Sequence, residues 1–226
     1  MIKTHSKVEL LRTDGTDLDV ANAARVSFDK QSDWDVDPYG HSKLSERDSN
    51  LIGYLARHNH WTPFGHVGAQ FRVKAPVFVA RQLVKHSVGL VWNEVSRRYV
   101  DSEPEYLRMQ WRWAAENVKQ GSAGAMDAES SDRVDEVFWE AVEHSDRAYC
   151  EMLQLGVAPE QARAVLCLNH MTDWIWTGSL AAWARVCKLR LDFHAQGEVR
   201  DVAQRFNSLL THAFPVSWAA LMGSAK

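Results

Sequence analysis

Residues 67–86 read VGAQFRVKAPVFVARQLVKH, and this stretch holds the clearest pattern in the chain. Val67, Ala69, Phe71 and Val73 alternate with glycine or polar residues. Strict alternation of this kind predicts a β-strand that has one buried face and one polar face.

The second half of the stretch predicts a helix over residues 76–86. Pro76 suits the first turn of a helix, because the N–H that proline lacks has no helical partner there. Gln82, Lys85 and His86 follow at the spacing i, i+3, i+4, so we expect them to share one helix face. Residues 67–86 are thus predicted to form a strand that leads directly into a helix with three polar side chains. The other predicted elements are placed relative to this strand and helix.

Outward from this unit, helical and alternating periodicities recur along the whole chain. The expected strands are 7–13 and 172–177, and the expected helices are 19–28, 45–58, 130–156, 159–168, 176–191 and 199–213. The long helix 130–156 has a predicted apolar stripe of Val134, Phe138, Ala141, Ala148, Met152 and Leu155. Pro215 is expected to end the last helix. The sum is an α+β fold, mostly helical, with a small antiparallel sheet in a single domain of residues 1–226.

The composition and net charge restrict the classes of function that this chain can have. The net charge is −3 and 46% of the 226 residues are hydrophobic, which is ordinary for a globular protein and gives no global field that attracts nucleic acid or an anionic membrane. The start, MIKTHSKVEL, lacks the pattern of a secretory signal, and no apolar run reaches the ~18 residues of a membrane span. We therefore expect a cytoplasmic protein. Cys150, Cys167 and Cys187 lie too far apart for a CxxC pair and are expected to be reduced and buried.

The run from Lys85 to Tyr99, KHSVGLVWNEVSRRY, concentrates polar side chains around the apolar segment 88–92. In extended backbone, Glu94, Ser96 and Arg98 would project to one side. A guanidinium beside a hydroxyl suits a phosphate monoester, because arginine offers bidentate donors and serine adds one more. The alternative from spacing alone is a strand edge with its charges in water.

Two other segments carry chemistry-bearing side chains. HNHWTPFGH contains His58, His60 and His66, but without a nearby cysteine or carboxylate a metal site is disfavoured against Trp61 and Phe64 packing around a turn. Arg163 and Arg190 lie beside apolar helix faces, where an arginine either reaches solvent or binds a buried anion.

Taken in order, six segments resemble the flavin-dependent thymidylate synthases: NAARVSF, HWTPFGH, VKAPVFVARQ, NEVSRRY, GVAPEQARAVL and LRLDFHAQGE. The signature of that family is Arg-His-Arg, seven residues, then Ser. Here Lys85-His86-Ser87 is followed by eight residues before Ser96, so two signature positions differ and one residue is added.

The resemblance implies a homotetramer whose active sites form between subunits and bind FAD, dUMP and a folate. The implied reaction transfers the methylene of 5,10-methylenetetrahydrofolate to C5 of dUMP. NADPH reduces the flavin, the flavin supplies the hydride, and no protein nucleophile or metal is required. Neither nucleic acid nor a membrane is an expected partner.

The same resemblance implies site residues by matching position. For dUMP they are Gln82, Lys85, Glu94, Ser96, Arg97, Arg98, Arg163 and Arg190, with the phosphate near Ser96 and Arg98. For FAD and folate they are His60, Thr62, Lys85, His86, Ser87, Glu94, Ser179, Ala181, Arg185 and His194. Arg190 matches the catalytic arginine that activates the uracil, where a fixed positive charge stabilises developing negative charge. Ser179 and Ala181 stand where the family commonly has Asn and Arg, and Arg185 where it often has Asn.

Three alternatives remain open. A flavin- and folate-dependent enzyme could release a hydroxymethyl product if water meets the methylene intermediate. A degenerate member could bind nucleotide without turnover. A non-catalytic nucleic-acid-binding protein could use the run from Lys85 to Arg98 together with the ten tryptophans, although the acidic balance argues against this.

Overall fold

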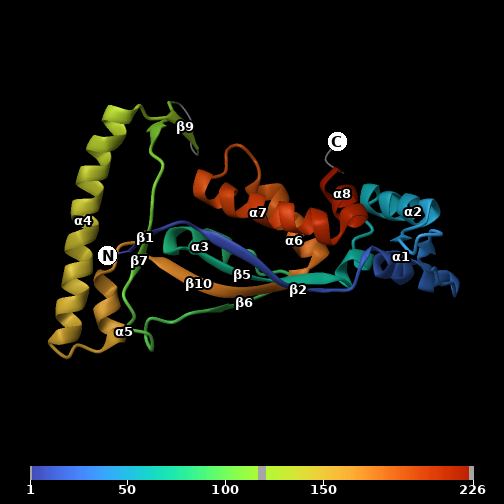
Figure 1. Ribbon diagram of the computed structural model, residues 1–226, viewed down its shortest axis with the longest axis horizontal. Helices are drawn as coiled ribbons and strands as arrows, with labels where there is room; N and C mark the ends of the chain where they lie inside the picture. The colour runs from blue at the N-terminus through green and yellow to red at the C-terminus, as the bar shows by residue number, and fades with distance from the viewer. Residues whose placement is uncertain (1, 117–120, 224–226) are drawn as a thin grey trace.

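The computed structural model describes residues 2–116 and 121–223, and a four-stranded antiparallel sheet organises them (Figure 1). The strand order is β2 (Lys7–Asp14), β5 (Gly68–Pro76), β10 (Met171–Ser179) and β6 (Leu90–Glu94). About half of the described residues are helical. The α+β class with its antiparallel sheet is therefore confirmed.

One face of the sheet is buried and the other is polar. Phe71 and Val73 of β5 are fully buried opposite Trp176 and Trp174 of β10. Three helices cover this face: α3 (Val77–Leu83), α6 (Leu180–Arg190) and α7 (Gly197–Ala213) (Figure 1). On the opposite face the Nε of Arg72 donates to the Asp173 carboxylate at 3.0 Å. The predicted alternation of residues 67–73 thus set the orientation of the central strand.

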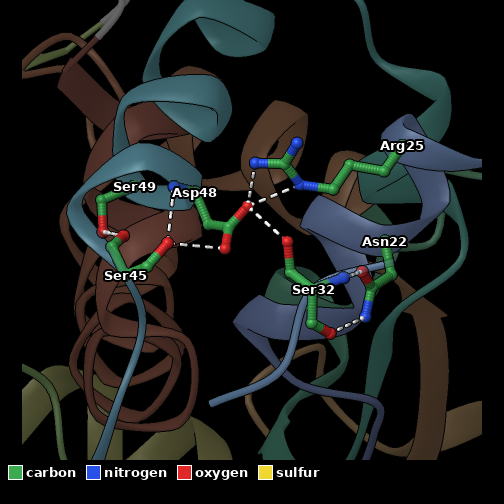
Figure 2. Close-up of polar contacts among 6 residues, drawn as sticks. All are labelled: Asn22, Arg25, Ser32, Ser45, Asp48 and Ser49. Atoms are coloured by element: carbon green, nitrogen blue, oxygen red, sulfur yellow. Dashed lines mark hydrogen bonds and ion pairs between the residues drawn. The ribbon is translucent and has the colours of Figure 1, made fainter. Parts of the chain in front are cut away.

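A second cluster of helices packs at one end of the sheet, formed by α1 (Asp17–Arg25), η1 (Val26–Phe28), α2 (Glu46–Arg57), η2 (Thr62–Gly65) and α8 (Pro215–Gly223). Figure 2 shows the polar network inside it, where the Nε of Arg25 donates to Asp48 at 2.7 Å. Ser32 and Ser45 donate their hydroxyls to the same carboxylate at 3.0 and 2.7 Å. These contacts hold the pKa of Asp48 below its usual value although its burial acts to raise it.

The long helix α4 (Ala128–Gln154) stands at the opposite end of the molecule, beside α5 (Pro159–Ala162) and η3 (Arg163–Val165) (Figure 1). Small two-stranded ribbons complete the fold. They are the parallel pair β1 (Ile2–Thr4) with β7 (Glu105–Leu107), and the antiparallel pairs β3 (Asp35–Val36) with β4 (Ser42–Lys43) and β8 (Arg112–Ala114) with β9 (Ser122–Ala125).

Glycines bring three segments to backbone contact where β5 begins and β10 ends. A Cβ added at Gly68 would lie 2.5 Å from the carbonyl oxygen of Gly178, and one at Gly178 would lie 2.3 Å from Leu90. Gly89, with φ of +74°, precedes β6 and accepts a hydrogen bond from the Ser179 N–H at 3.3 Å. The turn before β6 therefore packs directly on the start of α6.

Several predicted elements were wrong in their ends or their buried face. The helix 76–86 begins at Val77 and ends at Leu83, so Lys85 and His86 lie in a turn and do not share a helix face with Gln82. The helix 159–168 is shorter than predicted because it tightens into the 3₁₀ turn η3 and ends at Val165. Trp176 belongs to β10, so the following helix starts at Leu180.

Pro215 separates two helices instead of ending the last one. The carboxylate of Asp17 accepts hydrogen bonds from the backbone N–H groups of Val216 and Ser217 at 2.9 and 2.8 Å. A carboxylate at this position satisfies N–H groups that a helix start leaves unpaired, so α8 begins here.

The apolar stripe of α4 is also offset from the predicted one. The buried residues of the helix are Trp139, Val142 and Tyr149, whereas Ala141 and Leu155 of the predicted stripe are exposed. Because the helix is rich in charged residues, a few large side chains one position further along decide which face packs.

Trp61 and one cysteine differ from expectation as well. Trp61 is 61% exposed, while Phe64 is fully buried as predicted. Cys187 is buried and Cys167 half-buried, but Cys150 is exposed, and all three are free thiols. Within the described residues, no helix is long and apolar enough to cross a membrane.

Candidate functional site

A cavity of about 640 Å³ lies where β6, β10, α5 and the segment 95–105 meet. We call it the Arg163 cavity; its polar lining includes Lys74, Glu94, Arg97, Glu160, Arg163 and His170. The Nε of Arg163 donates to the Glu160 carbonyl at 3.2 Å, and the side chain is otherwise exposed. The cavity therefore brings Glu94, Arg97 and Arg163, three of the residues that the sequence predicted, to one place.

The expected line of Glu94, Ser96 and Arg98 is not extended. Strand β6 ends at Glu94, and the chain then turns, with the Tyr99 N–H donating to the Ser96 carbonyl at 3.0 Å. The turn still places Arg98 beside the cavity, since its Nε lies 3.7 Å from a carboxylate oxygen of Glu160. The Ser96 hydroxyl accepts from the Arg98 backbone N–H at 3.3 Å, so the serine side chain is tied to the backbone of the turn.

Other contacts orient the walls of the cavity. Glu94 accepts from the Thr172 hydroxyl at 2.7 Å and from the Trp92 indole N–H at 3.2 Å. Arg97 donates to the Ser102 carbonyl at 2.8 Å, and its guanidinium carbon lies 5.9 Å from the centre of the Tyr149 ring. These partners leave N–H groups of Arg97 available to an anion.

His170 is a cavity residue that the sequence analysis missed. Its Nδ1 lies 2.7 Å from the Cys167 carbonyl, which requires an Nδ1–H donor, so Nε2 is an acceptor in the neutral ring. Burial, with Arg97 nearby, lowers the pKa of His170. The only hint in the sequence is its place directly before a strand whose polar residues alternate.

A second cavity, of about 490 Å³, lies at the C-terminal end of α6. We call it the Arg190 cavity; its lining includes Gln82, Arg112, Ser122, Arg190, His194 and Gln196. The Gln82 side chain donates to that of Gln196, and Gln196 donates in turn to Glu198 at 2.9 Å. Gln196 immediately precedes α7, but its side chain makes no cap hydrogen bond and faces Gln82 instead.

Arg190 is held by a neutral histidine and a backbone carbonyl. Its Nε donates to Nε2 of His86 at 3.0 Å, and its NH2 donates to the Gln82 carbonyl at 3.4 Å. Arginine can only donate, so Nε2 of His86 is an acceptor and the ring carries its proton on Nδ1. Burial, followed by Arg190 and Arg185, lowers the pKa of His86. Burial also lowers the pKa of Arg190 from its ordinary value.

The predicted flavin contacts Ser179, Ala181 and Arg185 belong to the first turns of α6 or cap them. The Ser179 hydroxyl caps the helix by accepting from the Ala182 N–H at 3.3 Å, and Ala181 is buried in the core with 6% exposure. Arg185 is exposed and donates to the Val88 carbonyl at 2.6 Å. Ala181 therefore offers no side chain to a ligand, whereas Arg185 places a cation beside the turn that follows Ser87.

Four further predicted residues line neither the Arg163 cavity nor the Arg190 cavity. Lys85 and Ser87 are exposed in the turn between α3 and β6, on either side of His86. His60 and Thr62 are exposed between α2 and η2, with the His60 ring 6.0 Å from that of Tyr54. His194 lines the Arg190 cavity and has its Nδ1 2.9 Å from the Asp192 carboxylate.

The residue added to the signature causes no bulge in the sheet. Leu90–Glu94 pair one-to-one with Trp174–Gly178 of β10 without a register shift. The extra residue is therefore absorbed by the turns on either side of β6. Leu90 and Trp92 pack inward, but Val88 and Val91 are exposed, so the apolar segment 88–92 is only half buried.

Among the residues that the structure describes, the histidines together with Cys167 and Cys187 show no arrangement for metal or thiolate chemistry. In residues 2–116 and 121–223, no group of three His, Cys, Asp or Glu side chains is placed to hold a metal ion. Burial raises the pKa of the Cys187 thiol to about 12 and also raises the pKa of Cys167. Both thiols are therefore protonated at neutral pH.

Comparison with known proteins gives a consistent family. Residues 9–216 match the family model described as thymidylate synthase complementing protein. Flavin-dependent thymidylate synthases from Thermosipho africanus and Thermus thermophilus are 34% and 37% identical, over 92% and 94% of this chain and 87% and 74% of theirs. The crystal structure of a UMP/dUMP methylase from Streptomyces cacaoi, bound with 5-Br dUMP, has a TM-score of 0.85 at 26% identity, covering 99% of this chain and 97% of that one. The chain belongs to the family of flavin-dependent thymidylate synthases.

Proposed function

We propose that this protein methylates dUMP to dTMP, using 5,10-methylenetetrahydrofolate as the methylene donor, FAD as the cofactor and NADPH as the reductant. The observation that carries the proposal is Arg190, a half-buried guanidinium held in a cavity by a neutral histidine and a carbonyl. Within the described part of the chain, no carboxylate pairs with it. Its charge is therefore available to a substrate.

Arg190 acts on the pyrimidine. C5 of the uracil is a weak nucleophile unless the ring carries negative charge, and a fixed cation lowers the energy of that anionic state. His86 positions the arginine through its Nε2, and it can do so only while neutral. Gln82 and Gln196 add amide groups that match the hydrogen-bonding edge of a uracil.

The Arg163 cavity holds the phosphate of the nucleotide. Arg97, Arg98 and Arg163 supply the donors; the first two follow the turn at Ser96, and the third is held by the Glu160 carbonyl. Arginine suits this task because its planar fork binds two phosphate oxygens at once. Glu160 lies within 3.7 Å of Arg98 and is exposed, so a phosphate can replace it at little cost.

These two cavities share no lining residue, although α3 contributes Val77 to the first and Gln82 to the second. One nucleotide reaches both if copies of the chain assemble so that the Arg163 cavity of one faces the Arg190 cavity of another. This supports a homotetramer with active sites between subunits.

The residues around the start of α6 have the charge and hydrogen-bonding groups that suit the diphosphate of FAD. Lys85 and Arg185 place two exposed cations around the turn 87–89, and the Ser179 cap lies against that turn. Cations beside a helix N-terminus favour a diphosphate, although Lys85 lacks the bidentate fork of arginine. Bound FAD, once reduced, supplies the hydride that completes the methyl group.

The test combines a product assay with complementation. Purified protein given FAD, NADPH, methylenetetrahydrofolate and dUMP is expected to form dTMP, identified by mass. A hydroxymethyl nucleotide would support the variant reaction, and methylation of UMP in preference to dUMP would change the substrate. Failure to bind FAD or dUMP would contradict the proposal.

Complementation tests the assembly separately. Arg98→Ala and Arg190→Ala are each expected to be impaired, and a mixture dissociated and reassembled together is expected to regain activity, because some sites draw both intact arginines from different chains. A mixture no more active than its components would contradict sites shared between chains.

A further inference from the structure

The Arg190 cavity is backed by a series of hydrogen bonds that ends on a buried carboxylate. Glu198, in the first turn of α7, is 7% exposed. Its Oε1 accepts from NH2 of Arg112 at 2.6 Å, and its Oε2 accepts from Nε2 of Gln196 at 2.9 Å. Oε1 of Gln196 accepts in turn from Nε2 of Gln82. We call this series, from Gln82 through Gln196 to Glu198, the amide relay. Its two glutamines line the cavity, whereas Glu198 does not.

Arg112 is held over the start of α7. Besides its contact with Glu198, its Nε donates to the Ser122 hydroxyl at 2.8 Å. A Cβ added at Gly197 would lie 2.7 Å from NH1 of Arg112, so the guanidinium rests directly on bare backbone. Glu198 therefore faces a fixed cation, and an ionised carboxylate can only accept hydrogen bonds.

The carboxylate gives the amide relay a direction. A glutamine amide has a donor end and an acceptor end, so two linked amides alone could run either way with the same number of hydrogen bonds. Because Glu198 only accepts, Gln196 turns its nitrogen toward Glu198 and its oxygen toward Gln82. The nitrogen of Gln82 then faces Gln196. Its side-chain oxygen is left over, and it makes no hydrogen bond within the described part of the chain.

This unpaired oxygen belongs to a residue that also contacts Arg190. The backbone carbonyl of Gln82 accepts from NH2 of Arg190 at 3.4 Å, and both side chains line the same cavity of about 490 Å³. Gln82 is only partly buried, so a ligand in the cavity can reach its amide. A ligand beside Arg190 therefore meets an amide whose direction Glu198 has set.

We propose that Glu198 is a positioning residue, which holds the amide relay in one direction so that Gln82 accepts a hydrogen bond from N3–H of uracil and the site rejects cytosine. The proposal rests on the proposed function, which places the pyrimidine of dUMP beside Arg190. Uracil carries a hydrogen on N3, whereas N3 of neutral cytosine is an acceptor. Two facing acceptors leave both groups unpaired, so the direction of the relay becomes a preference between the two bases.

A purely structural role for Glu198 has different consequences. Its ion pair with Arg112 ties β8 to α7, and a carboxylate in the first turn of a helix stabilises that end of the helix. Losing these contacts would loosen the site and weaken the binding of both nucleotides alike. Only a loss of direction would change the preference between uracil and cytosine.

The experiment titrates dUMP and dCMP separately onto the full chain supplied with FAD and measures the heat of binding. The wild type is expected to bind dUMP more tightly than dCMP. Glu198→Gln keeps the shape of the side chain but can donate as well as accept, so the relay can reverse and Gln82 can turn its nitrogen to the ligand. The ratio of the two affinities is expected to fall roughly five- to tenfold, with dUMP binding weaker and dCMP binding tighter.

Gln196→Leu covers the case in which Glu198→Gln fails to fold. It interrupts the relay but leaves the pair of Arg112 and Glu198 in place, so Gln82 can rotate and the ratio is expected to fall as well. Asp201→Asn is the matched control, because it makes the same kind of change at an exposed carboxylate one turn further along α7. It is expected to keep the wild-type ratio. Melting curves on the same samples record the stability of each variant.

The outcomes separate the two proposals. Equal weakening of dUMP and dCMP binding in the folded variants, with the ratio unchanged, would overturn the positioning role of Glu198 and leave the proposed function standing. A wild type that binds dUMP and dCMP equally would do the same. Failure of the wild type to bind dUMP would instead contradict the proposed function.

Discussion

Arg25 and Arg190 are both removed from solvent to a large extent, but their surroundings differ. Arg25 is 9% exposed and meets Asp48, which is 2% exposed and accepts from two serine hydroxyls as well. Arg190 meets His86 Nε2 and a carbonyl, neither of which carries a negative charge. A cation whose charge is neutralised internally stabilises a fold, whereas one held by neutral acceptors keeps its charge for a ligand.

Removing the counter-charge of Arg25 should give the largest loss of stability. Asp48→Ala is expected to lower the free energy of unfolding by about 3 to 5 kcal/mol, because it leaves Arg25 buried without its counter-charge. Urea denaturation followed by circular dichroism measures this. The double variant Arg25→Met/Asp48→Leu should recover most of the loss. A decrease below about 1 kcal/mol in Asp48→Ala would show that water solvates Arg25.

Removing Arg190 should lower the rate of turnover and leave the stability of the fold nearly unchanged. Arg190→Ala is expected to lower kcat about 10²- to 10³-fold, the usual result of removing one charge-stabilising donor, with the thermal midpoint nearly unchanged. Steady-state turnover and a melting curve on the same sample measure both. Lys188→Ala, an exposed cation on the same helix, is the control. Unchanged turnover in Arg190→Ala would remove the role given to it.

A third arginine tests an intermediate case. Arg98 is half exposed and faces Glu160 at 3.7 Å, so its pair contributes little to stability. Arg98→Ala is expected to weaken dUMP binding by about 2 kcal/mol, since the contact to phosphate is charge-assisted. Titration calorimetry measures it. Glu160→Gln should leave dUMP affinity equal or tighter, and a marked loss there would mean that Glu160 orders Arg98.

The smallest expected effect concerns the histidine beside Arg190. Arg185 helps to lower the pKa of His86, so Arg185→Ala should raise that pKa, as measured by NMR titration of the ring. Protonation of His86 removes the acceptor for Arg190, so activity should fall as the pH decreases through the pKa of His86. In Arg185→Ala this loss of activity should begin at a higher pH. Lys188→Ala should not move it. A shift to lower pH in Arg185→Ala would reverse the electrostatic argument.

The fold was predictable where periodicity and burial agree. The alternation at 67–73 gave β5, and the segment 172–177 lies within β10, because single-faced burial leaves a period of two in the sequence. The stripe of α4 was predicted only in part: Phe138 and Met152 pack against buried residues, but Ala141 and Leu155 are exposed, since the charged surface leaves few apolar positions to define a face. The start of α8 depends on Asp17, nearly 200 residues away, and no local pattern contains that contact.

For the candidate site, the sequence predicted which residues lie there better than it predicted how they are arranged. The resemblance supplied Gln82, Arg163 and Arg190, but spacing predicted an extended line after Glu94 where the chain turns. His170 escaped notice because tertiary packing, and not sequence spacing, places it at a cavity. The assignment of roles to these residues and the single-domain organisation stay predictions.

The glycine contacts at the end of the sheet have a mechanical consequence. The Ser179 N–H donates to the Gly89 carbonyl and Gly68 lies against Gly178, so the loop before β6 contacts the main chain at the start of α6 directly. The two segments are therefore coupled through main-chain contact. A displacement of one of them would be transmitted to the other, and both belong to the region proposed to bind FAD.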